Sequence, residues 1–238
     1  MKKTVLVAGS HGSIGLALTK RLLQNDYRVI TASRSDLPSD DRVSAHLCVD
    51  MTQSDNVQKI RDWLSPYSSD LKGIIQCAGI LHDDNHSPEK HLGQVSAEWL
   101  EKSMSVNVLP HLYLSQAVSP LINSHSELTW VSLSAKVASI EDNQLGGWYS
   151  YRMSKAALNM FIKTLSIEWG RRSKRCTVIA MHPGTTPSAL SEPFTKNWPQ
   201  DKLYSPSMTA SRILAQFEHV NAEDSGRLYH HDGTVIPW

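Results

Sequence analysis

Thr4-Val5-Leu6-Val7-Ala8-Gly9-Ser10-His11-Gly12-Ser13-Ile14-Gly15 opens the chain with a short apolar run that ends in a glycine-rich turn. From Ile14 to Leu23 the apolar side chains recur at helical spacing, so this stretch predicts a strand, a tight turn and a helix. Glycines in such a turn let the backbone approach a pyrophosphate at the positive end of the helix. We therefore expect a dinucleotide to contact the residues of the turn, namely Gly9, Ser10, His11, Gly12, Ser13, Ile14 and Gly15.

Strand-like and helical segments alternate along the rest of the chain. Strands are expected at residues 27–32, 43–49, 73–78, 128–133 and 177–181, and two long helices at about 96–121 and 149–169. This alternation is typical of the α/β class, with a doubly wound parallel sheet of Rossmann type and helices on both faces. We expect the whole chain, 1–238, to form a single dinucleotide-binding domain.

Two segments carry further expectations about their surfaces. In the second long helix, one stripe is expected to be buried, and it contains Met153, Ala157, Met160, Phe161, Thr164 and Ile167. The least regular stretch runs from Pro187 to Pro206 and contains Phe194 and Trp198. Because long irregular loops in compact domains are often lids or binding loops, we expect this one to cover a binding site.

Composition and charge narrow the class of partner and the compartment. The chain has 24 basic and 23 acidic residues, so neither nucleic acid nor an anionic membrane is an expected partner. Three cysteines, Cys48, Cys77 and Cys176, lie far apart and suit buried thiols in a reducing compartment. The first apolar run is too short for a signal peptide, so a cytoplasmic protein with a small-molecule substrate is expected. Five histidines, His82, His86, His91, His230 and His231, are scattered or paired without acidic or cysteine partners at metal-ligand spacing, so no metal is expected.

One pair of side chains has the spacing of an acid-base site. Tyr151 and Lys155 lie four residues apart in a helical pattern, hence one turn apart on the same face. A nearby ammonium lowers the pKa of a phenol from about 10 toward the working pH, which would make Tyr151 a general acid and base. In the other long helix, Asn107 precedes Pro110, which removes the hydrogen bond to the Val106 carbonyl and can admit a water.

Several of these motifs resemble the short-chain dehydrogenase/reductase superfamily in its compact single-domain branch. They are the glycine turn, Asp50, Gln76-Cys77-Ala78-Gly79, Asn107, Ser134, Tyr151 with Lys155-Ala156-Ala157-Leu158, and Pro183-Gly184. The segment from Ser134 to Asn159 is most similar to C-factor-like carbonyl reductases, which carry a similar Gly-Gly-Trp-Tyr-Ser-Tyr-Arg run. Ala8 and Ser13 depart from the usual turn, and the resulting glycine spacing is commoner in the sugar-nucleotide-modifying branch. A chain of 238 residues has little room for that branch's substrate domain.

The resemblance implies a catalytic set of Asn107, Ser134, Tyr151 and Lys155. Tyr151 would transfer the proton, Lys155 would also bind the nicotinamide ribose, and Asn107 would support a water that relays protons. The usual spacing from the tyrosine places the family's serine at Ala138 here, so the serine must be assigned otherwise. We prefer Ser134, because the end of a strand would fix its hydroxyl, and Ser139 in the following loop is the alternative.

The cofactor contacts extend beyond the glycine turn. The resemblance implies contacts from Asp50, Met51, Cys77, Ala78, Gly79, Tyr151, Lys155, Pro183, Gly184, Thr185 and Ser188. At the end of the second strand, where NAD-binding folds place an acidic residue, this chain has Ser33 and Arg34. A guanidinium can hold a phosphate with two parallel hydrogen bonds, so NADP(H) is expected rather than NAD.

The expected function is that of an NADP(H)-dependent oxidoreductase, which interconverts a carbonyl and an alcohol on a small molecule by hydride transfer. One alternative is a nucleotide-binding signalling or regulatory protein with little turnover, suggested by the role attributed to C-factor and by the altered motifs. Another is sugar-nucleotide epimerisation, which would consume no cofactor. The resemblance also implies a homo-oligomer, a dimer or tetramer, paired through the helices that bear Asn107 and Tyr151.

Overall fold

The computed structural model describes residues 2–35, 42–196 and 199–238. Within them the strands form one sheet with the order β3-β2-β1-β4-β5-β6-β7-β8. The strands are β1 (Thr4–Ala8), β2 (Arg28–Ser33), β3 (Ala45–Cys48), β4 (Leu71–Gln76), β5 (Thr129–Leu133), β6 (Thr177–Met181), β7 (Leu228–Tyr229) and β8 (Val235–Ile236). Only β8 in this sheet runs antiparallel to its neighbour. The chain leaves β1 in one direction toward β3 and then crosses to β4, which creates a switch point between β1 and β4 where nucleotides bind in such folds.

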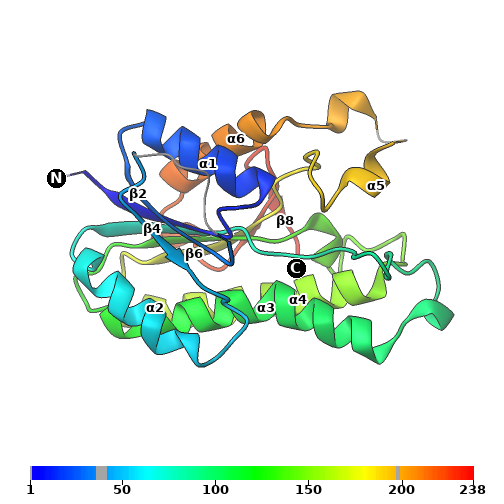
Figure 1. Ribbon diagram of the computed structural model, residues 1–238, viewed down its shortest axis with the longest axis horizontal. Helices are drawn as coiled ribbons and strands as arrows, with labels where there is room; N and C mark the ends of the chain where they lie inside the picture. The colour runs from blue at the N-terminus through cyan, green and yellow to red at the C-terminus, as the bar shows by residue number, and fades with distance from the viewer. Residues whose placement is uncertain (1, 36–41, 197–198) are drawn as a thin grey trace.

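Two helical layers cover the sheet (Figure 1). α1 (Ser13–Gln24) and α6 (Pro206–His219) lie on one face, and α2 (Asn56–Leu64), α3 (Ala97–Val118) and α4 (Tyr149–Arg172) lie on the other. The short α5 (Glu192–Thr195) stands beyond the carboxyl ends of the strands. This arrangement confirms the predicted doubly wound, Rossmann-type α/β fold.

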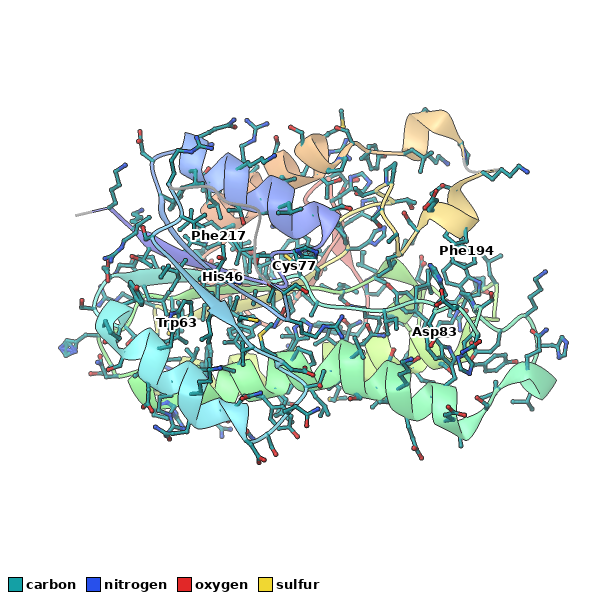
Figure 2. The ribbon with its side chains drawn as sticks, in the orientation of Figure 1. His46, Trp63, Cys77, Asp83, Phe194 and Phe217 are labelled. Atoms are coloured by element: carbon teal, nitrogen blue, oxygen red, sulfur yellow. The ribbon has the colours of Figure 1, made fainter. Side chains whose placement is uncertain are left out.

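A separate apolar core fills each side of the sheet, because successive side chains of a strand point to opposite faces. Leu6 and Ile74 pack in the core under α2, α3 and α4. Val5 and Val7 pack in the core under α1 and α6. Gly73 in β4 leaves space for the ring of Phe217, whose Cζ would lie 2.4 Å from a Cβ at that position (Figure 2).

The buried stripe of α4 differs from the predicted one. Met153, Met160 and Ile167 are 42%, 68% and 49% exposed, so this part of the prediction is wrong. The stripe that faces the sheet and α3 instead contains Leu158, Ile162, Leu165 and Trp169. The sequence offered two apolar stripes on one helix, and the structure buries the second.

The carboxyl-terminal third contains elements that were not predicted. β7 and β8 have two residues each, which is too short for an alternating pattern to stand out. The segment expected to be irregular contains α5 and a bridge between Thr185 and Leu203. In it the ring of Phe194 packs at a tilt against Trp148, with ring centroids 5.6 Å apart. Trp198, which belonged to the same prediction, lies outside the described residues.

Candidate active site

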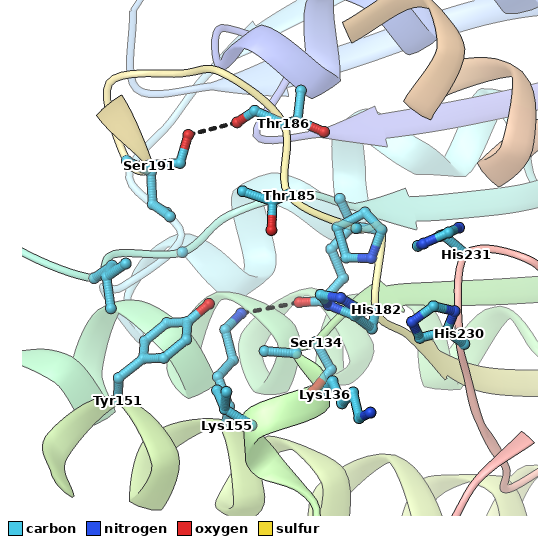
Figure 3. Close-up of a pocket in the computed structure, with 18 of the residues that line it drawn as sticks. Ser134, Lys136, Tyr151, Lys155, His182, Thr185, Thr186, Ser191, His230 and His231 are labelled. Atoms are coloured by element: carbon cyan, nitrogen blue, oxygen red, sulfur yellow. Dashed lines mark hydrogen bonds between the residues drawn. The ribbon is translucent and has the colours of Figure 1, made fainter. Parts of the chain in front are cut away.

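Two adjoining cavities open where the parallel strands end. The first, of about 730 Å³, lies over the glycine turn and is called the turn-side cavity. The second, of about 870 Å³, contains Tyr151 and is called the tyrosine-side cavity (Figure 3). Ile14, Cys77, Ala78 and Gly79 line both cavities, so the two meet above the end of β4.

The turn-side cavity brings together most of the predicted cofactor residues. They are Gly9, His11, Gly12, Ser13, Ile14, Gly15, Ser33, Arg34, Asp50, Met51, Cys77, Ala78, Gly79 and Ser188. Ser10 is buried behind them, and its hydroxyl donates to the carbonyl of Ala32 at 3.3 Å. A Cβ on Gly15 would lie 2.5 Å from the Gly9 oxygen, so the turn closes tightly against the start of α1. Such a turn leaves the backbone open to a phosphate.

The end of β2 places a cationic side chain at the rim of this cavity. Arg34 is exposed there and Ser33 is buried, with its hydroxyl donating to the Ser35 carbonyl. Asp50, from the neighbouring strand end, accepts from the amide and hydroxyl of Thr52 at 2.9 and 2.8 Å. This carboxylate is therefore engaged in its own turn, and no described residue of the cavity rim forms an ion pair with Arg34.

Lys155 extends from α4 to the floor of the tyrosine-side cavity. Its Nζ donates to the Leu133 carbonyl at 2.9 Å (Figure 3). A Cβ on Gly79 would lie 3.2 Å from that Nζ, so glycine permits the close approach of the segment after β4 and the ammonium. Burial lowers the pKa of Lys155 to about 8, and the neighbouring Cys77 opposes this shift. Lys155 can therefore exchange a proton with its surroundings near pH 8.

Tyr151 points its hydroxyl into the same cavity (Figure 3). The sequence predicted a lowered pKa for this phenol through Lys155, but burial raises the pKa of Tyr151 well above its ordinary value. The prediction of a lowered pKa is thus wrong for the structure as described. Burial therefore keeps on Tyr151 the proton that a reduction needs, while the raised pKa makes the phenol a weaker acid.

Asn107 ties the end of β4 to the base of Tyr151. Its Oδ1 accepts from the Ile80 amide at 2.8 Å, and its Nδ2 donates to the Ile80 carbonyl at 3.0 Å. The same Nδ2 lies 2.9 Å from the Ser154 Oγ, and Ser154 donates to the Tyr151 carbonyl at 3.0 Å. Asn107 is completely buried, so this side chain acts as a fixed bridge between α3 and α4.

The two candidate serines have their hydroxyls directed elsewhere. Ser134 lies along the tyrosine-side cavity, but its Oγ donates to Asn159 Oδ1 at 2.6 Å and both residues are buried. Ser139 lines neither cavity, and its Oγ accepts from the Asp142 amide at 3.1 Å. Ala135 follows Ser134 in extended backbone, with φ −145° and ψ 145°, and also lines the cavity. Side chains alternate in extended backbone, so the position opposite to Ser134 is occupied by an alanine.

The start of α4 is fixed by the Gly-Gly-Trp segment. Gly146, Gly147 and Trp148 all have left-handed backbone, with φ of 65°, 65° and 53°. Arg152 donates to the Gly146 and Gly147 carbonyls, both at 3.0 Å. The carboxylate of buried Glu89 accepts from the amide and hydroxyl of Ser150. These contacts set the direction in which α4 presents Tyr151, and the role of Glu89 was not predicted.

The segment after β6 forms the roof of the tyrosine-side cavity. Gly184 has φ +81°, and a Cβ there would lie 2.7 Å from the Tyr204 ring. The Thr185 hydroxyl points into the cavity (Figure 3), and Thr186 lies above it, with its Oγ1 2.6 Å from Thr209 Oγ1. The predicted residues Pro183, Gly184, Thr185 and Ser188 all line the cavity.

Three histidines on the far side of this cavity were not predicted as site residues. His182 follows β6, while His230 and His231 follow β7. Their convergence depends on the pairing of β6 with β7, which a pattern of two-residue strands does not reveal. The His-His pair near the chain end was the only signal in the sequence.

The amino-acid sequence also matches a known protein family. Residues 3–198 match the model of the short chain dehydrogenase family. The chain belongs to this family. The short-chain dehydrogenase is 29% identical over 240 residues to 1-hydroxy-2-glutathionyl-2-methyl-3-butene dehydrogenase of Rhodococcus sp. (strain AD45), covering 99% of each chain. It is also 27% identical over 147 residues to C-signal of Myxococcus xanthus, covering 62% of this chain and 83% of that one.

Solved structures share the fold of this short-chain dehydrogenase. The carbonyl reductase Sniffer of D. melanogaster superposes with a TM-score of 0.82 at 20% identity, covering all of both chains. The NADPH-bound carbonyl reductase from chicken fatty liver also gives a TM-score of 0.82, at 22% identity, covering 100% of this chain and 99% of that one.

Within the described residues, no helix is long and apolar enough to cross a membrane. Nor does the described part of the chain gather three or more potential ligands into a metal site.

Proposed function

We propose that this short-chain dehydrogenase is an NADP(H)-dependent oxidoreductase that reduces a carbonyl to an alcohol, or performs the reverse, on a small molecule. The observation that carries the proposal is the placement of Tyr151 and Lys155 in a cavity that joins the glycine-turn cavity above β4. The Rhodococcus relative is named as a dehydrogenase and the two solved neighbours as carbonyl reductases, which supports this reaction class.

The residues of the turn-side cavity fit a dinucleotide. The close approach of Gly9 and Gly15 leaves no space for a Cβ and opens the turn to a pyrophosphate. Arg34 stands at the rim, where it would hold the 2′-phosphate that distinguishes NADP from NAD. Structural neighbours described with bound NADPH or NADP support this preference. When bound, the nicotinamide supplies the hydride.

In the reductive direction, Tyr151 donates the proton to the developing alkoxide. The protonated phenol is the form that burial favours, and this direction therefore needs no prior loss of its proton. Lys155, whose pKa is about 8, lies on the same face of α4 and can restore the proton through solvent. Asn107 keeps the two helices in register by bridging Ile80 and Ser154. These roles are proposals for this chain.

The role predicted for Ser134 fits this geometry poorly. A hydroxyl can donate only one proton, and that of Ser134 goes to Asn159. The hydrogen bond counts against Ser134 as the group that orients the substrate oxygen, and the contact of Ser139 with Asp142 does the same for the alternative. We propose that Ser134 positions α4 through its hydrogen bond to Asn159. Position 135, which lines the cavity, is an alanine, so we propose that the site works without a serine hydroxyl there.

The decisive test is turnover. Purified protein is assayed for NADPH oxidation with a panel of aldehydes, ketones and quinones, and Tyr151→Phe serves as the control. We expect turnover with at least one carbonyl class that the variant loses. Tight NADPH binding without turnover would instead favour the nucleotide-binding regulator, and conversion of a sugar nucleotide without net NADPH consumption would favour an epimerase.

We also propose that two copies of the chain pair through α3 and α4. Met153, Met160 and Ile167 form an exposed apolar stripe on α4, and such stripes usually mark contacts with another surface. Met160→Glu places a charge in this stripe and should convert the oligomer to a monomer, as measured by light scattering after size-exclusion chromatography. A monomeric wild-type protein would contradict the proposal.

A further inference from the structure

Three imidazole rings and one ammonium form a wall of the tyrosine-side cavity. The rings of His230 and His231 lie 4.1 Å apart, and that of His182 lies 5.3 Å from His230 and 6.3 Å from His231. Lys136, from the loop after β5, lies beside them (Figure 3). These four residues are called the histidine wall. They come from three separate strand ends and face the cavity that contains Tyr151.

Contacts within the protein hold some side chains of the histidine wall and leave others without a hydrogen bond. His231 Nδ1 lies 3.0 Å from Arg212, and Lys136 Nζ lies 3.4 Å from the Asp142 carboxylate. His230 Nδ1 is 3.2 Å from Asp232 but has no hydrogen bond of normal geometry.

His182 is the group left open to a ligand. Its imidazole makes no hydrogen bond to any described residue. The ring is partly buried and lines the cavity, so a ligand group or water in the cavity can serve as its hydrogen-bond partner.

The charge around the wall favours an anionic partner. Four cationic side chains line the cavity, Lys136, Arg152, Lys155 and Lys202, against two carboxylates, Asp142 and Asp232. This excess is local, because the whole chain has a formal net charge of only +1. The pKa of His182 responds to the same surroundings: burial lowers it to about 3, with further lowering by His230, His231 and Lys136.

We propose that the histidine wall binds a carboxylate group of the substrate, while the reacting carbonyl lies at Tyr151. This deepens the proposed function and rests on it. A carboxylate between His182 and Lys136 would receive N–H donors from both and replace missing hydrogen bonds of the wall. Asp142 and Asp232 already compensate part of the positive charge, so a single negative charge suits the wall better than a doubly charged phosphate.

A bound carboxylate should also favour the protonated form of Lys155, which lines the same cavity. Because the pKa of Lys155 is about 8, its positive charge grows as the pH falls from 8 to 6, and carboxylate binding should strengthen over that interval. His182, whose pKa burial lowers to about 3, donates to the carboxylate as a neutral ring. The titratable groups that act on His182 are His230, His231 and Lys136. The other charged groups that line the cavity are Asp142, Arg152, Lys155, Lys202 and Asp232.

The test compares ligands that differ only in the carboxylate. Turnover with NADPH is measured for benzaldehyde and for 2-, 3- and 4-carboxybenzaldehyde, which vary the reach from carbonyl to anion. Independently, benzoate and benzamide are titrated into the NADP⁺-loaded protein at pH 6 and pH 8. We expect at least one carboxybenzaldehyde to have a kcat/KM ~10-fold or more above that of benzaldehyde, as for one charge-assisted contact. Benzoate should bind more tightly than benzamide, and more so at pH 6.

The variants separate the wall from the rest of the site. His182→Asn and Lys136→Met should reduce the carboxylate preference to less than ~3-fold, and Lys136→Arg should retain it. His125→Asn alters an exposed histidine in the loop before β5 and serves as the matched control. The proposal is overturned if the wild-type protein has equal kcat/KM values for benzaldehyde and the carboxybenzaldehydes and also binds benzoate and benzamide equally tightly. If benzoate binding depends on the wall but no aldehyde is reduced, the carboxylate site stands and the proposed function fails.

Discussion

Replacing Ser134 separates a structural role from a catalytic one. In Ser134→Ala the carboxamide oxygen of Asn159 loses a buried donor at 2.6 Å, which costs about 1–3 kcal/mol of unfolding free energy. For a chain of this size each kcal/mol lowers Tm by about 2–4 °C, so a loss of about 2–12 °C is expected. Turnover per folded molecule should fall by less than ~10-fold, far short of the 10²–10³ expected for loss of a donor to the reacting oxygen.

The neighbouring position supplies the matched experiment. Ala135 lines the cavity in extended backbone, on the side opposite to Ser134. Ala135→Ser adds one hydroxyl facing the reacting groups and should raise kcat by ~10-fold or more, because a preorganised donor stabilises the developing oxyanion. The Ser134→Ala/Ala135→Ser double variant should keep that gain with the lowered Tm.

The assay pairs thermal unfolding with steady-state NADPH oxidation on a carbonyl substrate identified by the panel. Ser139→Ala is the control, because Ser139 lines neither cavity and should leave kcat within ~3-fold. A loss of ~100-fold or more in kcat for Ser134→Ala at unchanged Tm would refute the reasoning and restore Ser134 to the role predicted from the sequence.

Three further predictions concern the proton donor and the cofactor. Tyr151→Phe should lower kcat at least ~100-fold, since general acids typically contribute 10²–10⁴, and should leave the Kd of NADPH nearly unchanged in fluorescence titration; near wild-type rates would exclude Tyr151 as the donor. NADPH should bind at least ~10-fold more tightly than NADH, and Arg34→Ala should remove most of this difference by weakening NADPH alone, whereas equal affinities of the wild-type protein for both would rule out this role. Because burial lowers the pKa of Lys155 to about 8, the proton source for Tyr151 is lost as the pH rises through that value. In the reductive direction, kcat/KM should therefore decline above about pH 8, and a flat profile through that region would contradict the proton route.

The fold and the position of the site could be predicted because short-range patterns determine them. β1 begins and ends at the residues expected from its apolar run, and the glycine turn leads directly into α1. Tyr151 and Lys155 share a helix face by spacing alone, and the structure places both in one cavity.

Other features depend on contacts that spacing does not encode. The exposure of Met160 was predicted wrongly, because two stripes of α4 are apolar and only tertiary packing decides between them. The pKa of Tyr151 moves opposite to the expected direction, because burial raises it and the sequence does not show how deeply the phenol is buried. His182 and His230 meet through the pairing of β6 with β7, which lie far apart in the chain.

The direction of the Ser134 side chain follows from the register of β5. Trp130 packs edge-on against Trp169 with ring centroids 5.6 Å apart, which fixes the even-numbered side of this strand toward α4. Ser132 continues that side, with its Oγ 2.8 Å from the His111 ring, and Ser134 completes it at Asn159. Because side chains alternate, one buried tryptophan determines where a hydroxyl four residues later can point. A serine at an even-numbered position here therefore points toward the layer of α3 and α4. A hydroxyl that contacts the substrate must instead stand at position 135.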